Sequence, residues 1–254
     1  MDLQAATERW SLTLGEPYVQ GAAGYTTRAA LADGTPVVLK LVHPHHESEH
    51  EADALEAWGG DGAVRLLARD ETGYVLLLER CEPGTHLSTF DPDAALDVLI
   101  GLLPRLWMPA EKPFHTLADE AAWWASYVPD QRHDRRLRDA ALAAIRELTP
   151  TQGEQVLLHQ DLHAENVLAA QREPWLVIDP KPLVGEREFA VAPIVRSFEL
   201  GHSKRDVLHR FDRLTGELGL DRDRARGWAI AQTVAWTFDS YHPRHVETAR
   251  WLLE

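Results

Sequence analysis

Cysteine is nearly absent from this sequence. One residue in 254 is a cysteine, so no disulfide can form within the chain, which is typical of the reducing cytoplasm where we expect this protein. The N-terminal segment MDLQAATERW lacks the basic stretch and apolar core of a secretory signal. No run of about 18 apolar residues is present, so we expect no membrane-spanning helix and no membrane partner.

Basic residues are also scarce. The chain has 26 Lys and Arg against 40 Asp and Glu, a formal net charge of -14. Such an acidic chain is poorly suited to a nucleic-acid backbone, so we expect no nucleic-acid partner and consider a cationic one a better match. The rest of the composition, 44% hydrophobic and 26% charged, is that of an ordinary globular protein.

The first third of the chain is predicted to be a small β-rich lobe. The Asp33-Gly34 dipeptide predicts a tight hairpin, and a helical pattern over 47–58 stops at Gly59-Gly60. The expected strands cover 18–24, 26–31, 36–42, 63–68 and 74–79.

After Glu82-Pro83-Gly84 the pattern becomes mostly helical, with one β interruption over 156–178. The expected helices cover 92–107, 117–127, 132–147, 187–200, 204–218, 223–238 and 243–253. The pattern predicts an α+β, bilobal architecture, with a small N-terminal lobe over 1–81 and a larger helical lobe over 82–254.

The segment 156–168, VLLHQDLHAENVL, carries the most informative pattern. An apolar run precedes Asp161, and Asn166 follows five residues later. Strands over 167–170 and 175–178 then predict a hairpin that ends at Asp179. The start of the first strand of an antiparallel hairpin lies beside the end of the second, so we expect Asn166 next to Asp179.

These three side chains match the chemistry of phosphoryl transfer from a nucleotide. Mg²⁺ prefers carboxylate, amide and phosphate oxygens, so Asn166 and Asp179 are its predicted ligands. Asp161 is the predicted base that orients an acceptor hydroxyl and takes its proton. The alternative is an N-capping aspartate and two turn residues of a surface hairpin, but order and spacing favour the catalytic interpretation.

A lysine suited to nucleotide phosphates lies in the apolar strand 37–42, VVLKLV. Lys40 is one of only four lysines, and an ammonium there is unfavourable unless it is paired. Glu51 falls on the apolar face of the following helix and is the predicted partner. We expect the pair to position the α- and β-phosphates; the alternative is a lysine that extends to solvent from an edge strand.

Two further segments are candidates for nucleotide contacts. Gly21 and Gly24 could let backbone amides approach the phosphates. Between the lobes, the main-chain carbonyl of Glu79 and the amide of Cys81 are the expected adenine contacts. Side-chain identity matters little at such a position.

The chain resembles the aminoglycoside-phosphotransferase-type small-molecule kinases, and within them the streptomycin 6-kinase/hydroxyurea phosphotransferase family. The segments that carry the resemblance are VVLKL (37–41), EADALEAWGGDGAVRLLA (51–68), LLHQDLHAENVL (157–168) and PWLVIDPKPLVGE (174–186). It spans about residues 15–240 and implies a protein-kinase-like fold that uses ATP or GTP with Mg²⁺.

Residue by residue, the resemblance implies Asp161 as the base, Asn166 and Asp179 as magnesium ligands, and Lys40 and Glu51 as the phosphate-positioning pair. It also implies that Lys181 lies in the active site. The chain departs from the pattern at Gln160, where a small or basic residue is usual, and at Ala190. Ala190 stands where these kinases usually have an aspartate that hydrogen-bonds the catalytic loop, so the rigidity of that loop is in question.

The acceptor is expected to be a small hydroxylated molecule. The acidic composition favours a cationic molecule that bears amine or guanidinium groups, and the resemblance implies an aminoglycoside such as streptomycin. Glu165 and Asp239 are its candidate partners and Trp236 is a candidate stacking surface. One alternative is a kinase of the same fold that acts on a metabolite, such as a sugar, an amino alcohol or a hydroxyurea-like acceptor. Another is a pseudokinase that binds nucleotide without turnover.

Overall fold

The computed structural model describes residues 2–18, 24–110, 113–130, 134–237 and 242–254. The chain divides into two compact units. The first comprises Met1–Thr85 with Val167–Pro182, and the second His86–Asn166 with Leu183–Glu254. The first unit thus runs slightly past the boundary expected after residue 81 and also takes in a hairpin from the middle of the sequence.

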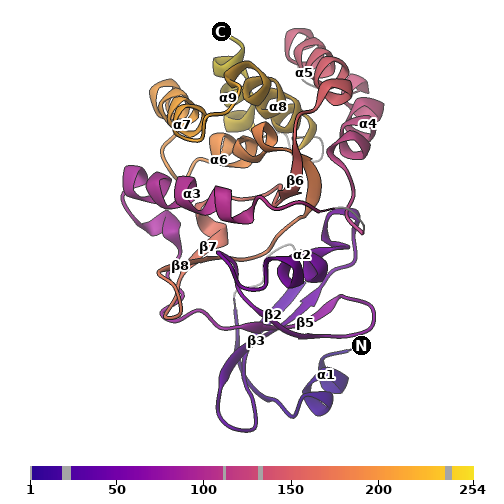
Figure 1. Ribbon diagram of the computed structural model, residues 1–254, viewed down its shortest axis with the longest axis vertical. Coiled ribbons are helices and arrows are strands. Elements are labelled where there is room, and N and C mark those ends of the chain that lie inside the picture. The colour runs from indigo at the N-terminus through magenta and orange to yellow at the C-terminus, as the bar shows by residue number, and fades with distance from the viewer. Residues whose placement is uncertain (1, 19–23, 111–112, 131–133, 238–241) are drawn as a thin grey trace. The chain divides into compact units, whose positions relative to one another are not determined.

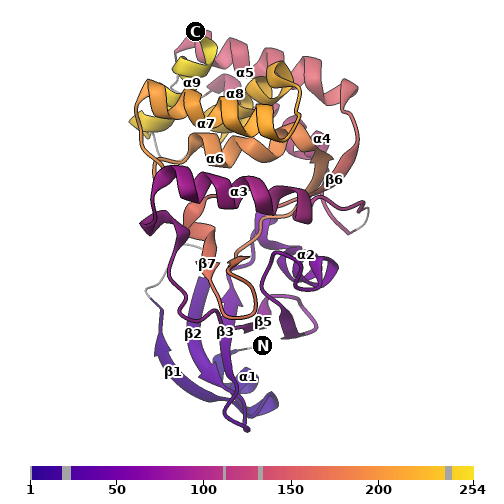
Figure 2. The same ribbon diagram turned by 60° about the vertical axis from the view of Figure 1, so that its left-hand side comes forward.

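An antiparallel five-stranded sheet forms the centre of the first unit, with the strand order β1-β2-β3-β5-β4 (Figure 2). Its strands are β1 (Thr13–Pro17), β2 (Gly24–Ala30), β3 (Pro36–Val42), β4 (Leu66–Arg69) and β5 (Val75–Glu79). The β2–β3 hairpin turns at Asp33-Gly34, where Gly34 has a φ of 87°. The amide of Thr35 donates to Asp33 Oδ1, so the turn predicted from the sequence is present.

Strand alternation gives the two faces of this sheet different roles. Leu39 and its neighbours on one face pack with α1 (Leu3–Arg9) in an apolar cluster. Lys40 lies on the opposite face, opposite Leu76 of β5, and contacts α2 (Glu51–Trp58). Helix α2 ends at Gly59 in the left-handed conformation, which is the end predicted from the sequence.

A short hairpin, β7 (Val167–Ala169) and β8 (Trp175–Val177), completes the first unit. Val177 bridges to Ala63, and the amide of Gly84 donates to the carbonyl of Ala169. These backbone bonds join the hairpin to the first unit although more than 80 residues separate it in sequence from most of the sheet.

The second unit consists mainly of helices, among which α5, α8 and α9 lie side by side (Figure 1). The helices are α3 (Pro92–Leu106), α4 (Leu117–Tyr127), α5 (Arg135–Leu148), α6 (Ala192–Arg196), α7 (Lys204–Glu217), α8 (Arg222–Ala235) and α9 (Pro243–Leu253). Phe189 lies in the core between the rings of Trp124 and Trp228, with centroids 5.9 and 6.0 Å away. None of the helices in the described part of the chain has the length and apolar character that crossing a membrane requires.

Two features of the second unit differ from the sequence prediction. Strand β9 (Leu183–Glu186) pairs with β6 (Gln155–Leu158) and was not expected, because four residues are too few to show a period. The helix expected over 187–200 is instead a 3-10 helix, Arg187–Val191, followed by the short α6. The backbone is extended at Ser197, so 198–200 lie outside the helix.

Candidate active site

In the first unit, Lys40 is paired with two carboxylates. Its Nζ lies 2.5 Å from Glu51 Oε1 and also donates to Asp179 Oδ1. Lys40 and Glu51 are 6% and 2% exposed, whereas the side chain of Asp179 is 31% exposed. The ion pair expected between Lys40 and Glu51 is therefore present. The second carboxylate, from the end of the hairpin, was not predicted as a partner of the lysine.

The charges of this triad influence one another. Burial acts to lower the pKa of the Lys40 ammonium, but the negative charges of Glu51 and Asp179 outweigh it, and the pKa is raised. Lys40 therefore stays charged. Burial, and to a lesser extent the charge of Asp179, raises the pKa of Glu51 to about 7 even though Lys40 acts against this.

Asp179 has a φ of 59°, in the left-handed region that aspartate tolerates better than most residues. It follows β8 by two residues, and Asn166 directly precedes β7, where Val167 pairs with Val177. Lys181, two residues further on, has its Nζ 3.8 Å from Glu47 Oε2, a long ion pair that leaves it near the same end of the hairpin.

The other expected nucleotide contacts lie at the end of β5 and at the start of β2. Glu79 is the last residue of β5 and Cys81 lies two residues beyond it; the Glu79 carboxylate is held by Arg172 at 2.8 and 3.0 Å. Burial raises the pKa of the Cys81 thiol to about 12, so this cysteine is not a nucleophile. Gly24 begins β2, where a Cβ would lie 2.2 Å from the carbonyl oxygen of Leu41, so close strand packing already requires a glycine. Gly21 lies outside the described residues.

In the second unit, β6 leads into the loop that carries Asp161. The buried Gln160 has a φ of 61°, and its carbonyl accepts a hydrogen bond from Gln232 of α8. The amide of Asp161 donates to the carbonyl of His159 at 2.8 Å. Asn166 Nδ2 donates to the carbonyl of Asp161 at 2.9 Å, an orientation that directs Oδ1 elsewhere and suits it to ligate a metal ion.

Sequence reasoning missed three side chains that support this loop: Arg196, Glu199 and Gln232. Arg196 Nη2 donates to Asp161 Oδ1 at 3.3 Å, and Glu199 accepts from the amide of Ala164 at 3.0 Å. Arg196 and Glu199 were assigned to a regular helix, where neither had an expected partner. Of the three, only Gln232 could have been noticed in the sequence. It is an amide in the middle of a helix, it is fully buried in the structure, and a buried amide needs a hydrogen-bond partner.

The candidate acceptor residues have different surroundings. Glu165 is exposed, and its main-chain carbonyl contacts His86 Nδ1 at 2.8 Å. Trp236 ends α8, and its ring stacks with the guanidinium of Arg196 at 4.4 Å. Asp239 lies outside the described residues.

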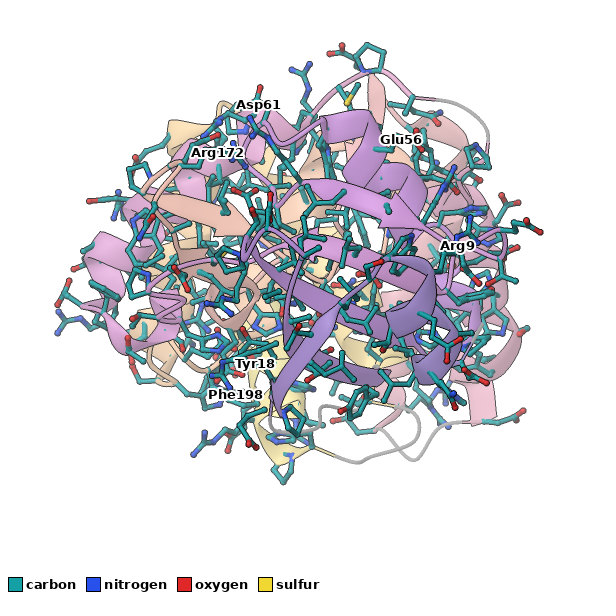
Figure 3. All side chains as sticks on the ribbon, turned by 90° about the horizontal axis from the view of Figure 1, so that it is seen from below. Arg9, Tyr18, Glu56, Asp61, Arg172 and Phe198 are labelled. Atoms are coloured by element: carbon teal, nitrogen blue, oxygen red, sulfur yellow. The ribbon has the colours of Figure 1, made fainter. Side chains whose placement is uncertain are left out.

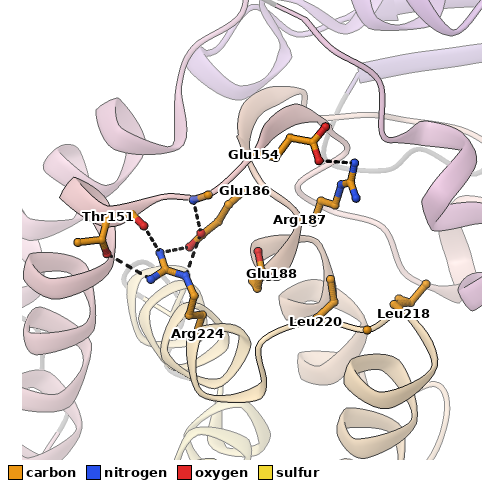
Figure 4. Close-up of a pocket in the computed structure, with 10 residues that line it drawn as sticks. Thr151, Glu154, Glu186, Arg187, Glu188, Leu218, Leu220 and Arg224 are labelled. Atoms are coloured by element: carbon orange, nitrogen blue, oxygen red, sulfur yellow. Dashed lines mark hydrogen bonds and ion pairs between the residues drawn. The ribbon is translucent and has the colours of Figure 1, made fainter.

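A pocket of about 330 Å³ elsewhere in the second unit has charged walls (Figure 4). Arg224 donates to Glu186 at 2.8 Å, and Arg187 pairs with Glu154 at 2.6 Å. Four of the charged side chains that line this pocket are thus paired with one another. The candidate residues for chemistry remain those of the Lys40 triad and of the Asp161 loop.

Known proteins resemble this chain over most of its length. Residues 9–239 match the model of a family described as aminoglycoside/hydroxyurea antibiotic resistance kinase. A hydroxyurea phosphotransferase from Kitasatospora aureofaciens is 44% identical over 239 residues, 89% of this chain and 68% of that protein. A streptomycin 6-kinase from Streptomyces griseus is 41% identical over 249 residues, 91% of this chain and 80% of that protein.

Solved structures of low sequence identity show the same fold. The choline kinase LicA from Streptococcus pneumoniae superposes with a TM-score of 0.68 at 13% identity, over 98% of this chain and 96% of that one. The expected α+β, protein-kinase-like fold is confirmed.

Proposed function

We propose, from the premise that this chain belongs to the aminoglycoside/hydroxyurea antibiotic resistance kinase family, that it transfers the γ-phosphate of ATP to a hydroxyl of a small cationic acceptor. The chain is a small-molecule kinase and uses a nucleotide. An aminoglycoside such as streptomycin is the proposed acceptor. The observation that carries the proposal is the buried ammonium of Lys40, held charged between Glu51 and Asp179.

The donor set of the site fits magnesium. Asp179 contributes a partly exposed carboxylate and Asn166 an amide oxygen, which are hard ligands that this ion prefers. Mg²⁺ would neutralise phosphate charge. Lys40, fixed by Glu51, would bind the α- and β-phosphates and keep the γ-phosphate in line with the acceptor.

Asp161 is the proposed base. The acceptor oxygen forms a bond to the γ-phosphorus while the bond from that phosphorus to the bridging oxygen of ADP breaks. The acceptor proton passes to a carboxylate oxygen of Asp161, and ADP leaves with the electron pair of the broken bond. The amide and carbonyl of Asp161 are both hydrogen-bonded within its loop, which restricts where its carboxylate can lie.

The net charge of -14 supports a cationic acceptor. Glu165 and Asp239 remain the proposed carboxylate partners of its amine or guanidinium groups. Trp236 already stacks with the guanidinium of Arg196, so a role for it in binding would use another part of the ring.

A hydroxyurea-like acceptor is the second candidate, since the relative named for that activity is 44% identical to this chain. Its hydroxyl could be phosphorylated by the same residues without any carboxylate partner. The two candidates therefore differ in whether acidic side chains contribute to acceptor binding.

The test is an ADP-release assay with MgATP and a panel of streptomycin, other aminoglycosides, hydroxyurea, sugars and amino alcohols. We expect streptomycin to stimulate ADP release and Asp161→Asn to abolish this stimulation while calorimetric MgATP binding persists. Stimulation by hydroxyurea alone would favour the second candidate. Nucleotide binding with no acceptor-stimulated turnover would contradict both.

A further inference from the structure

The end of α6 and the turn that follows it direct two charged side chains at the loop of Asp161. Arg196, the last residue of α6, donates from Nη2 to Asp161 Oδ1 at 3.3 Å. The Arg196 side chain is buried, and its guanidinium stacks on the ring of Trp236 at 4.4 Å. A stacked guanidinium has few alternative positions, so Arg196 presents a fixed donor to the carboxylate.

Glu199, three residues later, contacts the same loop with both carboxylate oxygens. Oε1 lies 2.7 Å from His163 Nδ1, and Oε2 accepts a hydrogen bond from the amide of Ala164 at 3.0 Å. A carboxylate bound at two points fixes both the position and the direction of the loop segment that it contacts. His163 Nε2 is in turn 3.3 Å from Asn166 Nδ2, so the contact extends toward the other end of the loop.

A third side chain fixes the turn itself. Arg210 of α7 is 1% exposed, and its guanidinium donates to the carbonyls of Val195, Ser197 and Gly201. Carbonyls at the end of α6 and in the turn that follows it are thereby satisfied by one rigid group. The backbone on which Arg196 and Glu199 are mounted is therefore held in one conformation by α7.

We propose that Arg196 and Glu199 are positioning residues for phosphoryl transfer, and that Arg210 acts as the support of the turn that carries them. Glu199 holds the loop at His163 and Ala164, and Arg196 holds the Asp161 carboxylate directly. This inference rests on the proposed function, in which Asp161 takes the acceptor proton. Since misplacing a reacting group by about 1 Å costs on the order of 100-fold in rate, such support should appear in kcat.

The test variant is Glu199→Ala, which removes both contacts with the loop. We expect kcat to fall about 10- to 100-fold. The Kd for MgATP, measured by calorimetry, should change less than about twofold, because Glu199 makes no direct contact with the residues proposed to bind the nucleotide or Mg²⁺. Glu199→Gln keeps the shape and an oxygen for the Ala164 amide. It should therefore give an intermediate kcat and remain folded even if the alanine variant does not.

Asp134→Ala is the matched control. Asp134 caps α5 through the amide of Leu137 and pairs with Arg250, so its removal also destabilises the second unit. It makes no such contact with the Asp161 loop. We expect its kcat per folded molecule, normalised by the stoichiometry of MgATP binding, to equal that of the wild type.

The outcomes separate this inference from the proposed function. A normalised kcat of Glu199→Ala and Glu199→Gln equal to that of the control would show a purely structural role and overturn the inference, provided that Asp161→Asn is inactive in the same assay. Full turnover by Asp161→Asn would instead overturn the proposed role of Asp161 itself. A lower kcat together with an equally weakened MgATP affinity would also contradict a role limited to the Asp161 loop.

Discussion

A lysine inside a sheet remains charged only if its surroundings replace the water that it has lost, and for Lys40 two carboxylates do so. An anionic ligand that draws the ammonium toward itself competes with Asp179 more readily than with Glu51, because Asp179 is the more exposed of the two. Glu51 is thus suited to hold the lysine, and Asp179 is suited to exchange it for a metal ion.

Replacing Lys40 with methionine should weaken nucleotide binding. We expect Lys40→Met to raise the Kd for MgATP by about 10- to 100-fold, the equivalent of one charge-assisted hydrogen bond of about 1.5–3 kcal/mol. Calorimetric titration measures this directly. Lys204→Met removes an exposed lysine that pairs with Glu254 and should leave the Kd unchanged; equal effects of the two substitutions would show that only net charge matters.

Asp179→Ala should abolish the magnesium dependence of nucleotide binding. With the carboxylate gone, one of the two proposed oxygen ligands is lost, and Lys40 keeps Glu51 as its partner. We expect the affinity for ATP to become the same with and without Mg²⁺ in a calorimetric titration. An unchanged enhancement by Mg²⁺ would place the metal on other ligands.

How far single residues could be predicted depended on whether they lie on periodic elements. Lys40 and Glu51 lie on a strand and a helix, whose periods of two and 3.6 residues determine the direction of each side chain. Glu199 lies in a turn without a period, so nothing local indicated that it faces Ala164. Ala190 cannot hydrogen-bond the Asp161 loop. Glu199 accepts a hydrogen bond from that loop instead, and no pattern in the sequence indicated this contact.

At the scale of elements, ends marked by specific residues were predicted well. Helix α4 covers Leu117–Tyr127 and α9 covers Pro243–Leu253, as expected, and α2 ends at Gly59. Strand β9 was missed because its pairing with β6 is a long-range contact. Helix α1 was missed because seven residues with one buried side chain show no clear apolar face.

The β7–β8 hairpin illustrates how one side chain in a turn can bind an element to its unit. Arg172 (labelled in Figure 3) binds the Glu79 carboxylate through two nitrogens and also donates to the carbonyls of Gly60 and Ala63. The hairpin is thereby fixed to Glu79 at the end of β5, where an adenine contact is proposed. Burial acts to raise the pKa of Glu79, but the hydrogen bonds from Arg172 and from the amide of Arg65, together with the charges of both arginines, outweigh it and the pKa is lowered.

Arg172→Met should therefore destabilise the protein in a pH-dependent way. A carboxyl whose pKa is lowered on folding stabilises the folded state above its unfolded pKa, near 4.5, and this contribution is lost as the pH falls through the folded value. We expect a loss of about 1–2 kcal/mol at pH 7 for this partly exposed pair, shrinking as the pH drops below 4.5. Urea unfolding at pH 7 and at a pH below about 4.5 measures this loss of stability.

Arg65→Met is the control for that substitution. The main-chain amide of Arg65 donates to Glu79 and is retained in the variant, while its exposed side chain is removed. The charge of Arg65 is the smallest of the contributions that lower the pKa of Glu79, so the loss of stability in this variant at pH 7 should be much smaller than that in Arg172→Met. A pH-independent loss in Arg172→Met would mean that the carbonyl contacts with Gly60 and Ala63, rather than the Glu79 charge, provide the stabilisation.

At the scale of the whole molecule, composition predicted the class and order of the parts but not their exact membership. The change from β-rich to helical pattern near residue 82 reflects a real change in structure, since the five-stranded sheet ends with β5 and the helices of the second unit begin with α3. The hairpin within Val167–Pro182 belongs to the first unit through backbone bonds to Ala63 and Gly84. Such long-range pairings leave no local signal in the sequence.

The response of the whole chain to acid should depend on a group of histidines around Phe198, which is labelled in Figure 3. The rings of His242 and His245 lie 4.9 and 5.5 Å from that of Phe198, and His202 lies 6.1 Å away. Burial, and then the charges of Arg196, His242 and His202, lower the pKa of His245 to about 3. The folded protein therefore keeps His245 neutral at a pH where the unfolded chain protonates it.

Because the unfolded state binds the extra proton between about pH 3 and 6.5, the free energy of unfolding should fall as the pH decreases through this range. Because His245 is partly exposed and solvent screens its charge, we expect the free energy of unfolding to fall by about 1 kcal/mol or less per pH unit. His245→Leu should flatten the dependence of the urea midpoint on pH between 7 and 5. His209→Leu, which removes an exposed histidine of α7, should follow the wild-type slope. Parallel slopes for all three proteins would mean that His245 can be protonated without unfolding, and that other groups govern the loss of stability in acid.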